Sequence, residues 1–300
     1  MIKFEYTGLK IISKSIVEDL GDILNKVGIL HRIFSRIKTK DSIEEKIIRK
    51  KEKKTPYDGS KKMQDIIGIR IVTYFKDDID IITSILNKKY SIVERAIDNP
   101  LPTEFKPKRT NIVCKLPDNQ KDTFNSSADK NLMDDTFEIQ LRTILSEGWH
   151  EIDHSLRYKC EEDWKDHLDK SRLLNGIYAT LETSDMALKS LFDDLAYSHF
   201  KEKKWEALLR SKFRIKLSSE PLNQELKDFF DKNQNIAKVI LKLDRLDFLR
   251  KWSDSNIIVP YPISINNLLY IIGTIEQETI NNDELHNLIP DLIKLPLKQL

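Results

Sequence analysis

Cysteine is scarce in this chain of 300 residues, and long apolar runs are absent. Two cysteines, Cys114 and Cys160, are too few for a disulfide framework or a four-cysteine zinc site. No run approaches the roughly 20 apolar residues that a membrane-spanning helix needs, so no membrane contact is expected. The N-terminus lacks a long apolar core and a cleavage site, so no signal peptide is expected. Together these absences favour a protein of the reducing cytoplasm.

Net charge is also small, because 50 basic and 48 acidic residues nearly cancel. Hydrophobic residues make up 40% of the chain and charged residues 33%, which indicates one large or two modest globular domains with a heavily charged surface. The local balance differs: residues 36–62 contain eleven lysines or arginines and five acidic residues. This run is either a solvated helix face or a site for polyphosphate or nucleic acid.

Hydrophobic periodicity predicts an α+β fold. Residues 14–54 have helical spacing, and strands are predicted at 66–75, 90–97, 109–117 and 137–143. The polar stretch 118–135 is predicted to be a loop, and the chain after Trp164 is predicted to be almost wholly helical. We therefore expect an N-terminal domain at 1–164, with helices up to about residue 54, and a helical extension at 165–300.

The predicted strand FEIQLRT, 137–143, alternates cleanly between apolar and polar side chains. Phe137, Ile139 and Leu141 would point to one face, and Glu138, Gln140 and Arg142 to the other. Three functional polar groups on one face indicate either a solvent-facing strand or a strand that lines a site. A helix is expected next, with Trp149, Ile152 and Leu156 on its buried side.

Within that helix, residues 150–154 spell H-E-x-x-H, a pattern that can place two zinc ligands and a general base on one helix face. A zinc hydrolase needs a third ligand. One class of zinc proteases continues this motif with a glycine and a histidine, but this chain has Arg157 and Cys160 at those positions. Glu182 is a distant candidate for the third zinc ligand. The alternative is an ordinary amphipathic helix that carries two polar histidines.

A longer pattern covers the same helix. FEIQLRTILSEGWHEIDHSLRYK, 137–159, resembles the signature of RelA/SpoT-type alarmone synthetases. Two further blocks of that family are similar to RIKTKDSIEEKI, 36–47, and DIIGIRIVTYFKDDI, 65–79. The three blocks follow one another along this chain in the order that the family has. The resemblance implies a nucleotidyltransferase-like mixed sheet flanked by helices. It also implies transfer of the β,γ-pyrophosphate of ATP to a ribose 3′-hydroxyl, usually that of GDP or GTP. His150 falls where the family pattern is free, which makes the zinc motif a coincidence.

The resemblance implies roles for individual residues, and their chemistry suits those roles. ATP needs cations, and a helix-like stretch would aim basic side chains at its phosphates. Asp65 and Glu138 could flank one Mg²⁺ if their strands are neighbours. Expected catalytic residues are Glu138, Asp65 and Arg142; ATP-binding residues are Arg36, Lys38, Ser42, Lys46 and Arg70; acceptor-binding residues are Phe105, Arg109, Asn111, Gln140, His154 and Lys159.

One block departs from the family. Synthetases carry G-Y-R-S-L-H before the long loop, whereas this chain has FKPKRTNIV at 105–113. Pro107 and Asn111 take the places of the tyrosine and the histidine, and Phe105 could supply a stacking ring. Three functions stay open: an alarmone synthetase with a changed guanosine pocket; a toxic member that modifies adenosine nucleotides or a tRNA 3′ end; or an inactive nucleotide-binding protein. The extension could regulate, neutralise or form homo-oligomers, and without an H-D pair no alarmone hydrolase domain is expected.

Overall fold

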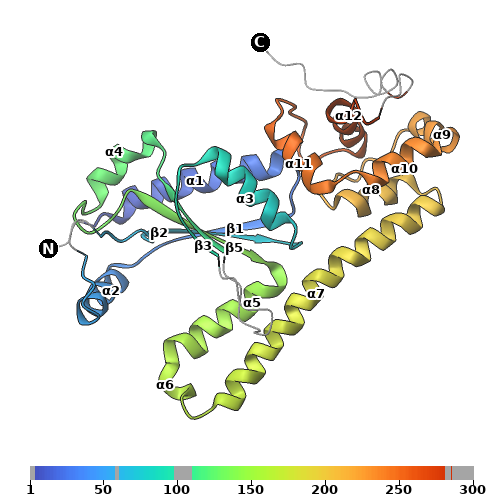
Figure 1. The fold of residues 1–300 in the computed structure, drawn as a ribbon. Helices are drawn as coiled ribbons and strands as arrows, with labels where there is room; N and C mark the ends of the chain where they lie inside the picture. Colours follow the sequence, from blue (N-terminus) through green and yellow to red (C-terminus); the bar gives the residue numbers. More distant parts are fainter. Residues whose placement is uncertain (1–3, 58–60, 98–109, 281–284, 286–300) are drawn as a thin grey trace. The chain divides into compact units, whose positions relative to one another are not determined.

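A computed structural model describes residues 4–57, 61–97, 110–280 and 285. It contains a five-stranded mixed sheet in the order β1-β2-β5-β4-β3 (Figure 1). The strands are β1 (His31–Ile37), β2 (Ile67–Thr73), β3 (Ile92–Ile97), β4 (Thr110–Lys115) and β5 (Thr136–Thr143). β2 and β5 run parallel at the centre, and the other pairs are antiparallel.

Helices precede, separate and follow the strands. The first half contains α1 (Tyr6–Lys26), α2 (Lys40–Glu52), α3 (Asp78–Lys89), α4 (Asp118–Ser127) and α5 (Ile144–Ile152). A π-helical turn (Asp153–Arg157), a 3-10 turn (Tyr158–Cys160) and α6 (Glu161–Trp164) come next. The remainder is α7 (Leu168–Lys201), α8 (Trp205–Phe213), α9 (Gln224–Lys232), α10 (Gln234–Lys242), α11 (Arg245–Asp254) and α12 (Ile265–Ile275). The predicted class, a mixed sheet flanked by helices with a helical C-terminal region, is confirmed.

The chain divides into two compact units. The first consists of residues 1–21, 31–74 and 86–183 and contains the whole sheet. Ile67, Ile69 and Ile71 of β2 are fully buried, as are Phe137 and Ile139 of β5. The alternate residues of both strands are polar or glycine and only half-buried over 68–70 and 138–140. The alternation predicted for 137–143 is therefore confirmed, and its polar face is free to line a site.

The second unit consists of residues 22–30, 75–85 and 184–300. Its core is aromatic, with Phe213, Phe230, Phe248 and Trp252 fully buried. Gly28 has a φ of +69°, and a Cβ on it would come within 2.6 Å of the Ile263 side chain, so only glycine fits.

Buried ion pairs join two segments of this unit. Arg245 donates hydrogen bonds to Asp78 at 2.6 Å, to Asp77 at 3.3 Å and to the Phe213 carbonyl at 2.7 Å. Arg214 donates to Asp77 at 2.7 Å. The helices after residue 184 thus share their core with segments from the first hundred residues.

Two expectations about secondary structure were wrong. The stretch 14–54 is not wholly helical, because β1 interrupts it. β1 is an edge strand with four exposed or half-exposed polar positions, so it lacks the apolar alternation that marks a strand. The stretch 118–135 is not all loop, because α4 occupies its first half. α4 buries only Phe124 and Ser127 and so shows little hydrophobic periodicity.

The expected burial of Ile152 and Leu156 was also wrong, because these side chains are 50% and 61% exposed. Leu156 lies in the π-helical turn Asp153–Arg157, where the extra residue per turn changes the direction of its side chain. Ile152 is the last residue of α5 and precedes that turn. Trp149 is buried as expected and donates to the Leu174 carbonyl of α7 at 2.8 Å. Within the described ranges, no helix combines the length and apolar character needed to cross a membrane.

Candidate functional site

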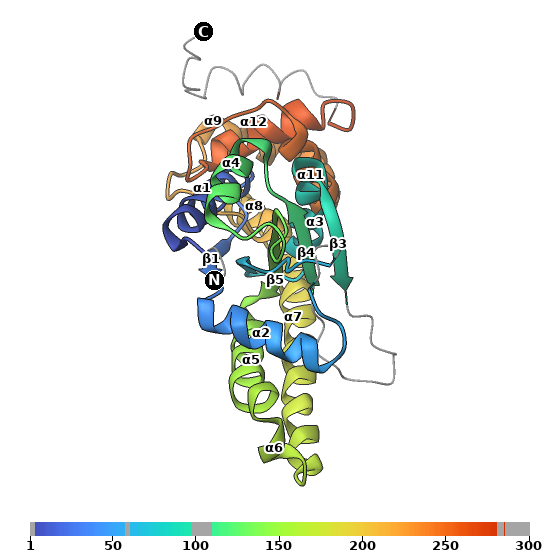
Figure 2. The same ribbon diagram turned by 90° about the vertical axis from the view of Figure 1, so that its left-hand side faces the viewer.

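Two open pockets lie in the first unit and share Lys46. We call the larger one the basic pocket; it has a volume of about 620 Å³ and is lined by Arg36, Lys38, Ser42, Glu45, Lys46, Arg49, His154, Tyr158 and Lys159, among others. We call the smaller one the carboxylate pocket; it has a volume of about 270 Å³ and is lined by Asp65, Glu94, Asn111 and Glu138 together with Lys46, Lys50, Tyr57, Lys61 and Lys62, among others. α2, the blue helix below the strands in Figure 2, contributes to both pockets.

The basic pocket is assembled where β1 ends and α2 begins. Thr39 caps α2, and its hydroxyl accepts the Ser42 amide at 3.3 Å. Ser42, Lys46 and Arg49 then follow at intervals of four and three residues, which places them on one helix face. Arg36 lies on β1 and Lys38 just after it, so the expectation of a single helical stretch for these side chains was wrong. The strand, the linker and the helix nevertheless direct them into one pocket.

The π-helical and 3-10 turns supply the other wall of the basic pocket. The His154 ring stacks on the Tyr158 ring with 5.9 Å between centroids and 13° between planes. Burial, followed by the charges of Lys159 and Arg36, lowers the pKa of His154, so the imidazole is neutral at pH 7. Lysine and arginine charges therefore dominate the pocket, which suits a polyphosphate.

Asp65 lies two residues before β2, and two lysines contact its carboxylate. Oδ2 accepts hydrogen bonds from Lys38 Nζ at 2.5 Å and from Lys46 Nζ at 2.6 Å. Burial raises the pKa of Asp65, but the Lys46 and Lys38 charges outweigh that effect and hold the pKa below its ordinary value. Oδ1 is buried and accepts no hydrogen bond from the part of the chain that the structure describes. A buried, ionised oxygen without a donor is a natural position for a cation.

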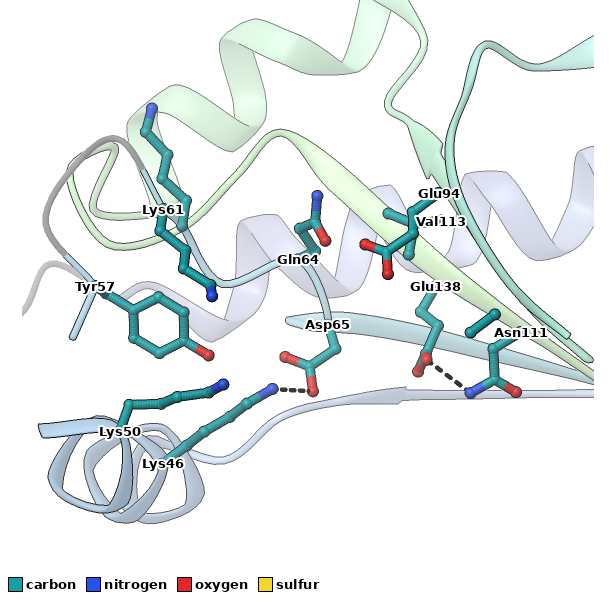
Figure 3. Close-up of a pocket in the computed structure, with 12 residues that line it drawn as sticks. Lys46, Lys50, Tyr57, Lys61, Gln64, Asp65, Glu94, Asn111, Val113 and Glu138 are labelled. Carbon is teal, nitrogen blue, oxygen red and sulfur yellow. Dashed lines mark hydrogen bonds and ion pairs between the residues drawn. The ribbon is translucent and has the colours of Figure 1, made fainter. Parts of the chain in front are cut away.

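Glu138 enters the carboxylate pocket from the neighbouring strand, because β2 and β5 pair in parallel with Gly68 opposite Glu138. Asn111 donates to Glu138 Oε1 at 2.9 Å (Figure 3), and Gln140 donates to Oε2 at 3.0 Å. Arg142 is buried and donates to Asn111 Oδ1 at 3.3 Å. Side chains from β4 and β5 thus orient the Glu138 carboxylate.

Arg70 of β2 is held by carboxylates of α5. It donates to Glu147 at 2.6 Å and to Glu151 at short range, and its Nε donates to Gln140 at 3.4 Å.

The residues of the H-E-x-x-H pattern do not converge on one site. Its glutamate, Glu151, pairs with Arg70. His154 lines the basic pocket, whereas the His150 ring contacts Tyr178. Among the described residues, no group of three histidine, cysteine or acidic side chains could hold a metal ion. The zinc hypothesis therefore has no support from the geometry.

The structure brings together most of the residues expected at a site. Arg36, Lys38, Ser42 and Lys46 share the basic pocket, and His154 and Lys159 lie with them rather than with Asn111. Asp65, Asn111 and Glu138 share the carboxylate pocket. Gln140 donates a hydrogen bond to Glu138, and Arg142 donates one to Asn111. Phe105 and Arg109 lie outside the described residues.

Several lining residues were not anticipated: Arg49, Lys50, Tyr57, Lys61, Lys62, Glu94 and Tyr158. Lys50 follows Lys46 by one helical turn, so the spacing along α2 could have indicated it. Glu94 belongs to β3, and only the sheet order brings it to this pocket. Arg49 lies on the helix face of Ser42 and Lys46, and Lys61 and Lys62 end the basic run 36–62.

A cation-rich pocket thus shares Lys46 with a carboxylate pocket beside the mixed sheet, and this combination of charges suits a phosphate ligand together with a cation. Residues 35–163 match the family model described as a region found in RelA / SpoT proteins. The chain is 32% identical to the GTP pyrophosphokinase YjbM of Bacillus subtilis over 129 residues, which are 42% of this chain and 56% of YjbM. It is 24% identical to the GTP pyrophosphokinase YwaC of the same organism over 153 residues, which are 50% of this chain and 68% of YwaC.

Solved structures resemble the same part of the chain. A GTP pyrophosphokinase family protein from Streptococcus pneumoniae superposes with a TM-score of 0.49 at 24% identity, over 63% of this chain and 91% of that one. The small alarmone synthetase 1 of Bacillus subtilis, bound to its product pppGpp, superposes with a TM-score of 0.45 at 26% identity, over 60% of this chain and 92% of that one.

Proposed function

We propose that this chain is a pyrophosphotransferase that moves the β,γ-pyrophosphate of ATP to the ribose 3′-hydroxyl of GDP or GTP. The observation that carries the proposal is the arrangement of the two pockets around Lys46, with cations in one and Asp65 and Glu138 in the other. The match of residues 35–163 to the RelA / SpoT family model, and the similarity to two GTP pyrophosphokinases, support it.

In this proposal the basic pocket binds the ATP phosphates. ATP carries about four negative charges, and the pocket offers lysine and arginine side chains from three separate elements. Lys38 and Lys46 reach the phosphates from one side and Lys159 from the other. Lys38 and Lys46 also contact Asp65, so phosphate binding would redistribute charge around that carboxylate.

Asp65 and Glu138 would hold a Mg²⁺ ion that bridges ATP and neutralises charge as the reaction proceeds. Their oxygens are hard ligands of the kind that Mg²⁺ prefers, and the buried Oδ1 of Asp65 has no donor among the described residues. Both side chains line one pocket, which is the condition for sharing an ion. Glu147 and Glu151 fit this role less well because Arg70 pairs with both.

The proposed chemistry is an in-line displacement. The acceptor 3′-oxygen forms a bond to the β-phosphorus of ATP, the bond from that phosphorus to the oxygen bridging the α-phosphate breaks, and AMP leaves. Glu138 accepts the proton of the 3′-hydroxyl, and the Asn111 and Gln140 side chains hold its carboxylate in place for that step.

The test is transfer from γ-³²P-ATP. Purified protein with Mg²⁺ is incubated separately with GDP, GTP, AMP and total tRNA, and the products are separated by thin-layer chromatography. We expect labelled GDP and GTP products and one AMP per transfer, with no transfer in EDTA. If only AMP or only tRNA became labelled, that molecule would be the acceptor instead of a guanine nucleotide. If no acceptor became labelled, pyrophosphate transfer would be rejected.

A further inference from the structure

The carboxylate pocket has a second end that the proposed chemistry does not use. It is formed by Tyr57, Lys50, Lys61 and Lys62, which we call the lysine rim. We infer that the lysine rim is the binding site for the 5′-phosphates and base of a mononucleotide acceptor, with the phosphates on the lysines and the base on the Tyr57 ring. This inference rests on the proposed function, because it assigns the acceptor of that reaction.

The two ends of the carboxylate pocket carry opposite charges. In Figure 3, Tyr57, Lys50 and Lys61 lie at one end, Glu94, Glu138 and Asn111 lie at the other, and Asp65 lies between them. An anionic ligand binds with its phosphates toward the lysines and away from the glutamates, because the opposite orientation places like charges together. Its 3′-hydroxyl then points toward Glu138, the residue that must accept the proton. The charge distribution therefore selects the orientation that the reaction requires.

The lysines come from two elements that converge on this end. Lys50 lies one turn after Lys46 on α2, so it extends the row of cations past the shared lysine. Lys61 and Lys62 come from the segment before β2 that also carries Asp65. Three ammonium groups on one rim make a site for a chain of phosphates, which offers several anionic oxygens in succession.

Tyr57 is the one aromatic side chain among the described residues that line this pocket. It is half-buried, and its hydroxyl end points toward Lys46 and Asp65 in Figure 3. A half-buried ring beside phosphate-binding lysines is a platform on which a base can stack without specific hydrogen bonds.

Equilibrium binding tests the inference without requiring transfer. The full chain is first saturated with the α,β-methylene analogue of ATP, which fills the donor pocket and cannot break at the α,β position. Titration calorimetry then measures the affinities for GMP, GDP and GTP. The variants are Lys50→Ala, Lys61→Ala, Lys62→Ala, the triple variant, Tyr57→Ala and Tyr57→Phe. Lys51→Ala is the matched control, because Lys51 is an exposed neighbour on α2 that does not line the pocket.

We expect each rim lysine to contribute about five- to tenfold to GTP affinity, as a partly exposed charge-assisted contact does. The loss in the triple variant should be largest for GTP, smaller for GDP and smallest for GMP. Tyr57→Ala should weaken all three nucleotides by at least about fivefold, and Tyr57→Phe should bind like the wild type because the ring remains. Affinity for the ATP analogue and the behaviour of Lys51→Ala should not change.

Three results would overturn the inference: an unchanged GTP affinity in the triple variant, an equal loss for all three nucleotides, or a loss confined to the ATP analogue. Failure of wild-type protein to bind any of the three while it binds a short RNA with a free 3′ end would also overturn it, in favour of a polynucleotide acceptor. If the binding results are as expected but no pyrophosphate moves, the lysine rim stands and the proposed function falls.

Discussion

Glu138→Gln separates catalysis from binding, because it removes one charge and keeps the size of the side chain. In the wild type, Glu138 accepts from Asn111 at 2.9 Å and from Gln140 at 3.0 Å. The variant amide has one oxygen for these two donors, so one hydrogen bond is lost. A hydrogen bond to a charged group contributes about 1.5–3 kcal/mol, which is a fraction of the usual 5–15 kcal/mol of a folded domain, so the variant should remain folded.

The catalytic effect should be much larger than the effect on binding. Loss of the proton acceptor should slow transfer by at least about two orders of magnitude. ATP binding without metal should change little or tighten, because a carboxylate near phosphates repels them until a cation arrives. Single-turnover transfer from γ-³²P-ATP measures the first quantity and calorimetry in EDTA measures the second. Circular dichroism on heating checks the fold.

Glu94→Gln is the matched control for this experiment. Glu94 lies on β3, lines the same pocket and carries the same charge, but it is exposed on an edge strand. Its substitution should alter transfer by less than about tenfold. A Glu138→Gln variant that transfers at a rate within tenfold of the wild type would refute a proton-accepting role, and equal losses in both variants would assign the effect to the charge of the pocket as a whole.

Three further predictions concern the metal, the donor pocket and the fold. Mg²⁺ should support transfer, and purified protein should contain no stoichiometric zinc by elemental analysis; tightly bound zinc that is lost in His150→Ala would contradict this. Lys38→Ala should weaken ATP binding about ten- to a hundredfold by calorimetry, because it removes one charge-assisted contact, and an unchanged affinity would remove the case for the basic pocket. Arg245→Ala should destabilise the second unit by about 3–5 kcal/mol, because it leaves a fully buried Asp78 without its ion-pair partner, whereas Lys189→Ala in an exposed pair should cost less than about 1 kcal/mol. Hydrogen exchange of the backbone amides in α8 and α11 measures the loss of stability in each variant. Equal protection of these amides in Arg245→Ala and Lys189→Ala would contradict the prediction.

Residues close in sequence explain why part of the site was predictable. Ser42 and Lys46 share a helix face, and Glu138 and Gln140 share a strand face, so spacing alone groups each pair. β1 escaped prediction because an edge strand with polar outward positions has no apolar period. The predicted burial of Leu156 was wrong because a π-helical turn changes the helical period without a signal in composition.

The sequence by itself determined the alternation of β5, the basic character of residues 36–62 and the helical nature of the C-terminal region. Only the tertiary structure placed Asp65 in the same pocket as Glu138, because that depends on the parallel pairing of β2 and β5 across about 70 residues of chain. Tertiary structure also brought Lys38 and Lys46 onto Asp65, and Tyr57 and Lys50 to the far end of that pocket. The physical reason is that backbone periodicity orders side chains within one element, whereas packing and strand register decide which elements meet.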